Sequence, residues 1–261
     1  MEYVIELKNV DKEFKVLNRH EGLKGSFQDL FSRDYKIIKA VNNVSMNIKP
    51  GEIVGYLGPN GAGKTTTLRM ISTLLSITSG TITVYGKDVM TQSEDVRRMI
   101  SYLPEDAGAY KDLTGRAYLE FMAEFFAQGD RKRAMVEKGM RIAKLGDRID
   151  SKIDTYSKGM KRRLLIARAI MFNPKLAIMD EVTSGLDVAN AFEVREIIRN
   201  IAKEGTSVII SSHNMFEVEL LCERVAMINK GEVVLEGTPE ELKERYSASN
   251  LEEVFMKAVR E

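Results

Sequence analysis

The sequence predicts an α/β protein built on a largely parallel sheet that helices cover. Three stretches carry this prediction. A strand, a glycine-rich loop and a helix follow one another between Glu52 and Leu75, and helices alternate with strands again between Ser157 and Ser211. Between them, Leu113 to Leu145 shows only helical periodicity. Alternating elements are typical of a parallel sheet, and the purely helical stretch indicates an inserted helical subdomain.

The N-terminal part predicts two strands separated by a polar insertion. Tyr3 to Phe14 alternates between apolar and polar residues, and Val41 to Ile48 places apolar side chains on one face. Leu17 to Tyr35 is charged and contains glycines, so we expect a surface loop there with at most a short helix near Phe27 to Phe31.

The next elements follow from apolar runs and helical spacing. Glu52 to Leu57 reads as a buried strand, and Lys64 to Leu75 has apolar residues at helical spacing. Further along we expect a strand pair near Thr81 to Tyr85, a short helix at Ser93 to Met99 and a strand at Ile100 to Leu103.

The middle and the C-terminal part predict further helices and strands. Leu119, Met122, Phe125 and Phe126 form an apolar helical stripe, and a second, charged helix is expected from about Arg131 to Leu145. The alternation then resumes with helices at Ser157 to Phe172 and Val188 to Lys203, and strands at Leu176 to Met179 and Ser207 to Ser211. Thr238, Pro239 and Glu241 predict a capping box that opens a terminal helix.

Composition excludes several classes of protein. The 261 residues carry 39 Lys plus Arg against 38 Asp plus Glu, so net charge gives no reason to expect a nucleic-acid partner. Cys222 is the only cysteine, which excludes an intrachain disulfide and a cysteine-based zinc cluster. No apolar run approaches the roughly 18 residues of a membrane span, and the charged start is unlike a signal peptide. We therefore expect a soluble intracellular chain.

The segment YLGPNGAGKTTT contains the most specific motif of the chain. Its GPNGAGKT core fits the phosphate-binding pattern G-x-x-x-x-G-K-[ST], between a strand and a helix as that pattern requires. Glycines let the loop backbone surround phosphate oxygens, and the helix start adds the positive end of its dipole. Lys64 is expected at the β- and γ-phosphates and Thr65 on magnesium. The residues expected to hold the triphosphate are Gly58, Pro59, Asn60, Gly61, Ala62, Gly63, Lys64, Thr65 and Thr66.

Two carboxylates follow the apolar strand LAIM. Asp180 and Glu181 stand at the C-terminal end of this strand, where open α/β sheets bind ligands. Asp180 is placed to orient magnesium through Thr65 or water, and Glu181 to accept a proton from an attacking water. The alternative is an ordinary acidic turn after a strand.

At this point the order of motifs resembles a known family. YSKGMKRR at 156–163, LAIMDE at 176–181, SGLD at 184–187 and SSH at 211–213 resemble the ATP-binding subunit of ABC transporters over essentially the whole chain. The opening insertion and the GTPEELKERY tail resemble the branch that powers drug, antibiotic or ion exporters.

This resemblance implies a P-loop ABC-type core with a mainly parallel sheet, an N-terminal antiparallel β subdomain and an inserted helical subdomain. The expected single domain spans 1–261, with the catalytic core and β subdomain at 1–100 and 164–237. The helical subdomain is expected at 101–163, and a C-terminal helical tail at 238–261.

The resemblance also implies roles for residues outside the phosphate loop. Ser157 and Gly159 would contact the γ-phosphate of ATP held by a second copy, and the N-cap position of Ser157 agrees with an anion-binding helix start. His213 would contact the γ-phosphate, and Asp187 would lie at the dimer seam. Phe14 would stack on adenine, with Tyr35 as the competing candidate.

Three positions depart from the family's commonest pattern. Glu105 replaces the usual Gln; it could ligate magnesium but cannot donate a hydrogen bond when ionised. Lys158 replaces a signature glycine, and Val182 replaces a proline after the catalytic glutamate. Neither of the last two changes removes a group that the chemistry uses.

The function implied is an ATPase that binds ATP and Mg²⁺, dimerises with a second copy or a paralogous ATPase subunit, and drives a transmembrane permease. Export is favoured over import, and the location implied is cytoplasmic, on the inner face of the membrane through the permease. The segment Tyr110 to Phe126 would meet that partner. Two alternatives stay open: a non-transport ABC module that acts on DNA or ribosomes, and an ATP-gated switch that hardly hydrolyses.

Overall fold

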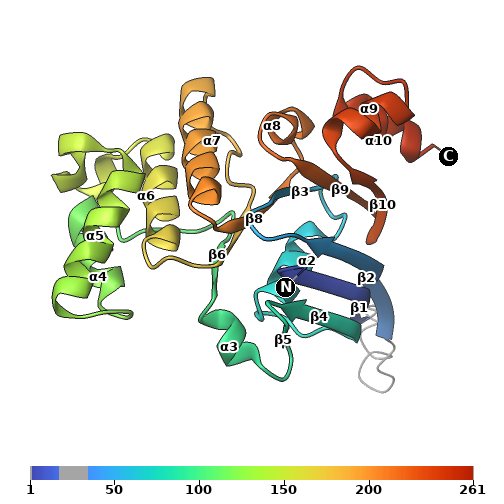
Figure 1. Ribbon diagram of the computed structural model, residues 1–261, viewed down its shortest axis with the longest axis horizontal. Coiled ribbons are helices and arrows are strands. Elements are labelled where there is room, and N and C mark those ends of the chain that lie inside the picture. The colour runs from blue at the N-terminus through green and yellow to red at the C-terminus, as the bar shows by residue number, and fades with distance from the viewer. Residues whose placement is uncertain (1, 18–34, 261) are drawn as a thin grey trace, which may run out of the picture.

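The computed structural model describes residues 2–17 and 35–260, which form two sheets and a set of helices (Figure 1). An antiparallel sheet has the strand order β2-β1-β4-β5, and a larger central sheet has the order β10-β9-β3-β8-β7-β6. Figure 1 shows helices α4 to α7 on one side of the molecule and the antiparallel sheet on the other. The predicted fold class is confirmed.

The antiparallel sheet contains longer strands than the sequence pattern predicts. Its members are β1 (Ile5–Leu17), β2 (Tyr35–Ile48), β4 (Ser79–Val84) and β5 (Lys87–Asp88). β1 and β2 pair as far as Leu17 with Tyr35, so regular pairing reaches both ends of the predicted insertion. The short helix expected near Phe27 to Phe31 lies outside the described residues.

The central sheet places the chemistry-bearing loops at one edge. Its strands are β3 (Ile53–Leu57), β6 (Ile100–Leu103), β7 (Leu176–Asp180), β8 (Ser207–Ser212), β9 (Arg224–Asn229) and β10 (Glu232–Gly237). β3 runs parallel to β8 and β9, β7 runs parallel to β6 and β8, and only β10 is antiparallel to its neighbour. The carboxyl ends of β3, β7 and β8 therefore lie next to one another. β9 and β10 were not predicted.

The helices largely follow the predicted spans. They are α2 (Lys64–Ile71), α3 (Ser93–Arg97), α4 (Gly115–Ala123), α5 (Gly129–Ala143), α6 (Lys158–Ile170), α7 (Val188–Lys203), α8 (Met215–Glu219), α9 (Pro239–Arg245) and α10 (Leu251–Ala258), with 3-10 turns η1 (Gly146–Asp150) and η2 (Ile153–Thr155). The Thr238–Glu241 capping box is confirmed. α2 stops at Ile71 instead of Leu75, because Thr73 turns into a left-handed conformation with φ 63°.

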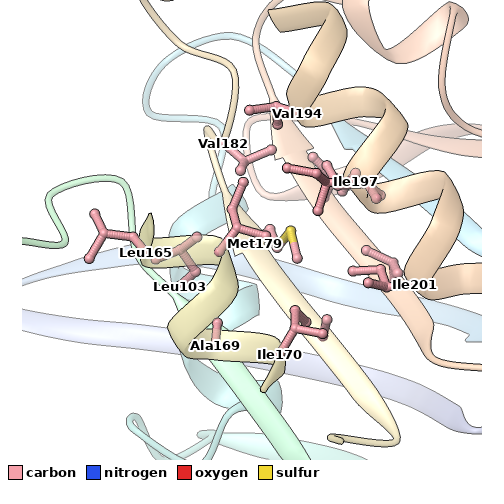
Figure 2. Close-up of a cluster of buried hydrophobic side chains, with 14 of the residues drawn as sticks. Leu103, Leu165, Ala169, Ile170, Met179, Val182, Val194, Ile197 and Ile201 are labelled. Carbon is pink, nitrogen blue, oxygen red and sulfur yellow. The ribbon is translucent and has the colours of Figure 1, made fainter. Parts of the chain in front are cut away.

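Two apolar cores lie on opposite faces of the central sheet. Val54 and Tyr56 of β3 pack with residues of the antiparallel sheet and α2, whereas their neighbours Ile53 and Leu57 pack on the other face. Figure 2 shows this second core between β7, α6 and α7, with Met179 at its centre. Because both faces of β3 and β7 are buried in close-packed cores, the ends of these strands hold the loops that follow them in fixed positions.

The inserted helices begin after β6. Because Ile100 to Leu103 pair with β7, the core includes residues up to Leu103, two beyond the start expected for the helical subdomain. α4 and α5 follow, and α6 leads back to the sheet. No helix in the described ranges, 2–17 and 35–260, is long and apolar enough to cross a membrane.

Candidate functional site

The loop between β3 and α2 surrounds the Lys64 ammonium. Lys64 Nζ donates to the carbonyl oxygens of Gly58 at 2.8 Å and Pro59 at 3.2 Å, so its side chain folds back over the loop. The side chain is buried, although Pro59, Asn60 and Gly61 around it are exposed. A ligand that enters over this loop therefore meets a desolvated cation, where charge interactions are stronger than in water.

Backbone geometry explains two of the loop glycines. Gly63 has φ 105°, and an added Cβ would lie 2.4 Å from the carbonyl oxygen of Ala40. At Gly58 an added Cβ would lie 2.2 Å from the carbonyl oxygen of Ile228. The turn after β9 also holds the loop, since Gly231 N donates to the Ala62 carbonyl at 2.9 Å. These contacts fix the loop shape from outside.

The start of α2 is open to an anion. Gly63 is its N-cap residue and makes no side-chain cap hydrogen bond, so the first helical N–H groups have no partner within the helix. Thr65 and Thr66 occupy its first turn and are half-buried. Free N–H groups and the helix dipole suit a phosphate at this position.

Asp180 is a buried carboxylate that joins two neighbouring elements. Its Oδ2 accepts a hydrogen bond from Thr65 Oγ1 at 2.8 Å, and its Oδ1 accepts one from Ser211 Oγ. The carboxylate comes from the end of β7, Thr65 from α2 and Ser211 from β8. The structure thus brings together Thr65 and Asp180, two of the three residues expected to hold magnesium, but not Glu105.

Glu181 lies between a lysine and a histidine. Its Oε1 is 3.7 Å from Lys64 Nζ, and its Oε2 is 2.9 Å from His213 Nδ1. Its backbone is left-handed with φ 49°, and its N–H donates to the Ser211 carbonyl at 3.1 Å. An uncommon backbone conformation held this way directs the carboxylate towards the loop.

The residues around Thr65 suit magnesium. A hydroxyl and a carboxylate are hard oxygen ligands, and Mg²⁺ is commonly bound by one or two such groups together with substrate phosphates and water. In the described ranges no group of three or more His, Cys, Asp or Glu could hold a metal ion. Phosphate oxygens would therefore have to complete the shell of an ion at Thr65 and Asp180.

Lys64, Asp180, Glu181 and His213 form a first cluster of functional side chains, and a second cluster forms where α6 and α7 begin. Ser157 caps α6 by accepting from Met160 N at 3.2 Å. Gly159 packs under Asn190, where an added Cβ would lie 2.1 Å from the Asn190 side chain. Asp187 caps α7 and accepts from Asn190 N at 2.9 Å and Asn190 Nδ2 at 2.7 Å. The Asn190 backbone N–H lowers the pKa of the Asp187 carboxyl, which keeps it ionised.

The two clusters are separate within one chain. Among residues 2–17 and 35–260, no hydrogen bond or ion pair joins Ser157, Gly159 or Asp187 to Lys64, Asp180 or Glu181. Ser157 and Asp187 are exposed, so their surface is free to meet another molecule.

Glu105 and the two aromatic candidates lie outside these clusters. The Glu105 side chain is exposed, and its carbonyl accepts from Arg162 at 3.2 Å. Phe14 is partly exposed on β1, with Lys12 Nζ 5.1 Å from its ring centre. Tyr35 pairs with Leu17 and Phe14 pairs with Ile38, so the two rings point to opposite faces of the hairpin. At most one of them can face the phosphate loop.

Sequence reasoning did not assign roles to two residues of these clusters. Ser211 contacts both Asp180 and Glu181, and Asn190 joins Gly159 to Asp187. The sequence could have indicated a role for Ser211, because Ser211 places a hydroxyl near the end of a largely apolar strand. Asn190 gave no such indication, since an Asn in a first helical turn is common.

Comparisons with known proteins identify the family that the chain resembles. A family model described as "ABC transporter" matches residues 41–184. The ABC transporter ATP-binding protein NatA of Bacillus subtilis (strain 168) is 37% identical over 228 residues, which are 87% of this chain and 93% of NatA. The daunorubicin/doxorubicin resistance ATP-binding protein DrrA of Streptomyces peucetius is 39% identical over 80% of this chain and 64% of DrrA.

A solved structure gives the same result for the fold. It is a dimeric ATP-binding cassette in a post-hydrolysis state bound to ADP and Pi. That structure aligns with a TM-score of 0.73 at 26% identity, over 90% of this chain and 98% of the other.

Proposed function

The chain belongs to the ABC transporter family as one of its ATP-binding, ATP-hydrolysing proteins, and on this premise we propose how its residues divide the work. The observation that carries the proposal is the convergence of Lys64, Glu181 and His213 beside the phosphate loop. We propose that ATP lies with its triphosphate on residues 58–66 and its γ-phosphate next to these three side chains.

Hydrolysis then uses the side chains that surround the loop. Lys64 contacts the β- and γ-phosphates, and the loop N–H groups stabilise the charge that develops on the γ-phosphate. Glu181 accepts the proton of the attacking water, and His213 orients Glu181 and the phosphate. Magnesium, held by Thr65 and Asp180 with Glu105 as a further candidate, would neutralise charge on the β- and γ-oxygens.

The second cluster supports a shared site. Ser157 is exposed at the start of α6 and Gly159 is buried behind it under Asn190; neither has a hydrogen bond to the catalytic side chains of its own chain within the described residues. We propose that they complete the site of a second copy or a paralogous subunit in a head-to-tail dimer, with Asp187 at the seam. Two such sites form together when two chains meet.

An aromatic surface supports a membrane partner. Tyr110, Phe121 and Phe125 are exposed and pack edge to face, with ring centres 5.6 Å and 5.4 Å apart. We propose that this surface meets a transmembrane permease on the cytoplasmic side of the membrane. Relatives named for daunorubicin/doxorubicin resistance, bacitracin transport and Nod factor export favour export as the direction.

Phosphate release from the purified protein tests the proposal. The specific activity should rise with protein concentration, because each site needs two chains. Glu181→Gln should abolish turnover, keep ATP binding and trap a dimer, whereas the exposed control Glu223→Gln should behave as the wild type. Undiminished turnover in Glu181→Gln would reject the role of Glu181, and ATP binding without turnover in the wild type would favour the ATP-gated switch.

A further inference from the structure

An exposed apolar patch lies beside the second cluster on α7 and α8. Its members are Val188, Phe192 and Phe216, which are 84%, 51% and 67% exposed. Large apolar side chains with such exposure, gathered in one place, mark interaction sites more often than chance. We call these three residues the α7–α8 patch.

Helical geometry places the patch on one surface. Val188, Phe192, Arg195 and Arg199 follow one another at intervals of four, three and four residues, so they form one stripe along α7. This stripe faces α8, because Arg195 pairs with Glu217 and Arg199 donates to the Leu220 carbonyl. Figure 1 shows α7 and α8 side by side. Phe192 lies one turn before Arg195, and Phe216 directly precedes Glu217, so the two aromatic residues belong to the helical turns that this ion pair joins.

The patch is continuous with the surface assigned to the dimer. Val188 directly follows Asp187, and Asn190 in the same helical turn packs on Gly159. A partner whose ATP contacts Ser157 and Gly159 must therefore also lie close to the first turn of α7. Polar contacts hold the base of the patch in shape, while the described part of the chain leaves half or more of each of its three apolar residues exposed.

We propose that the α7–α8 patch extends the head-to-tail interface, so that Val188, Phe192 and Phe216 of one chain pack against the same patch of a second copy. This inference rests on the proposed dimer. A two-fold axis brings identical surfaces together, and an apolar patch next to that axis is self-complementary. The contact adds affinity that does not depend on the nucleotide, whereas the Ser157 contact requires ATP.

Cysteine cross-linking tests the geometry. Val188→Cys in a Glu181→Gln background, with ATP, should form a disulfide-linked dimer under mild oxidation, because the two introduced thiols would face each other across the axis. The native Cys222 is buried, and burial raises the pKa of its thiol, so it gives little background reaction. Met256→Cys on α10, 47% exposed, is the matched control and should not cross-link.

Dimer affinity tests the energetics. In the Glu181→Gln background, Phe192→Ser and Phe216→Ser should each raise the ATP-bound dimer dissociation constant about tenfold or more, because each substitution removes apolar burial from both chains. Met256→Ser, on α10 and 47% exposed, lies outside the patch and should leave the dissociation constant unchanged. Sedimentation equilibrium measures all three.

The outcomes separate this inference from the proposed function. A Glu181→Gln dimer with unchanged affinity in both Phe variants and no Val188→Cys cross-link would overturn the patch inference and leave the shared sites intact. A Glu181→Gln protein that binds ATP but stays monomeric at all concentrations would overturn the dimer itself, and the patch inference with it.

Discussion

Lys64 Nζ lies 3.7 Å from Glu181 Oε1, and both side chains are buried. An ammonium and a carboxylate withdrawn from water each offset the desolvation of the other. A γ-phosphate over the loop would compete for Lys64. Once the lysine turns to the phosphate, the Glu181 carboxylate is left with His213 Nδ1 as its partner and can face the attacking water.

Removing Lys64 should therefore destabilise the nucleotide-free protein through Glu181. We expect Lys64→Met to lower the free energy of unfolding by about 3 kcal/mol, because it leaves a buried carboxylate without its cation. In a Glu181→Gln background the same substitution should cost roughly 1 to 2 kcal/mol less, since no charge is left unpaired. Urea unfolding of the four proteins measures this coupling. Equal costs in both backgrounds would show that the contact contributes nothing to stability.

His213 is expected to act through Glu181 and the γ-phosphate. Its Nδ1 lies 2.9 Å from Glu181 Oε2, so His213→Ala should leave the carboxylate less well oriented. We expect phosphate release to fall by about 10² or more while ATP affinity changes little, because positioned groups act mainly in the transition state. Equilibrium binding of a fluorescent ATP analogue gives the affinity. A parallel loss of binding and turnover would instead indicate a role in holding the loop.

Gly159 is expected to be required for dimerisation, because Asn190 leaves no room for a Cβ at this position. An alanine Cβ would lie 2.1 Å from Asn190, so Gly159→Ala must displace Asn190 and the Asp187 carboxylate that it binds. Binding of ATP to the monomer should persist, whereas the ATP-dependent dimer should weaken about tenfold or more. Gly108→Ala is the matched control, because its Cβ would meet nothing within 4 Å. A dimer of unchanged affinity would show that this surface is not part of the seam.

Local sequence patterns predicted the helices and strands that have a clear capping residue or a regular spacing of apolar residues. α7 begins and ends where predicted, since Asp187 caps it and apolar residues recur at helical spacing. β9 and β10 were missed because their identity depends on pairing with β3 and with each other, which no local pattern expresses. α2 ends at Ile71 instead of Leu75 because Thr73 adopts a left-handed φ of 63°, which the apolar spacing of this segment does not indicate.

The sequence predicted those residues of the site that belong to recognisable motifs, but not the contacts between them. Lys64, Thr65, Asp180 and Glu181 were placed in one site because parallel strands end at one edge of a sheet. The contact of Ser211 with Asp180 requires the register of β7 against β8, which the sequence does not display. The register of β1 against β2 likewise decides that Phe14 and Tyr35 lie on opposite faces of the hairpin, and the sequence does not display that register.

Asp11 should make the stability of the antiparallel sheet depend on pH. Its carboxylate accepts from Ser79 Oγ at 2.7 Å and from Asn43 N at 3.0 Å, and Lys39 Nζ lies at 3.0 Å. The Ser79 hydroxyl, the Asn43 N–H and Lys39 lower the pKa of Asp11 to about 2. In the unfolded chain its pKa is near 3.9, so between these two values the unfolded state binds the proton first.

The stability that this carboxylate contributes is therefore complete above about pH 4 and is lost as the pH falls towards 2. We expect wild type to exceed Asp11→Asn in free energy of unfolding at pH 7, and the difference to shrink steadily below pH 4. Urea unfolding of both proteins at matched pH measures it, and the other carboxylates cancel in the comparison. A difference that stays constant from pH 7 to pH 2.5 would mean that the hydrogen bonds hold the neutral and the ionised side chain equally well.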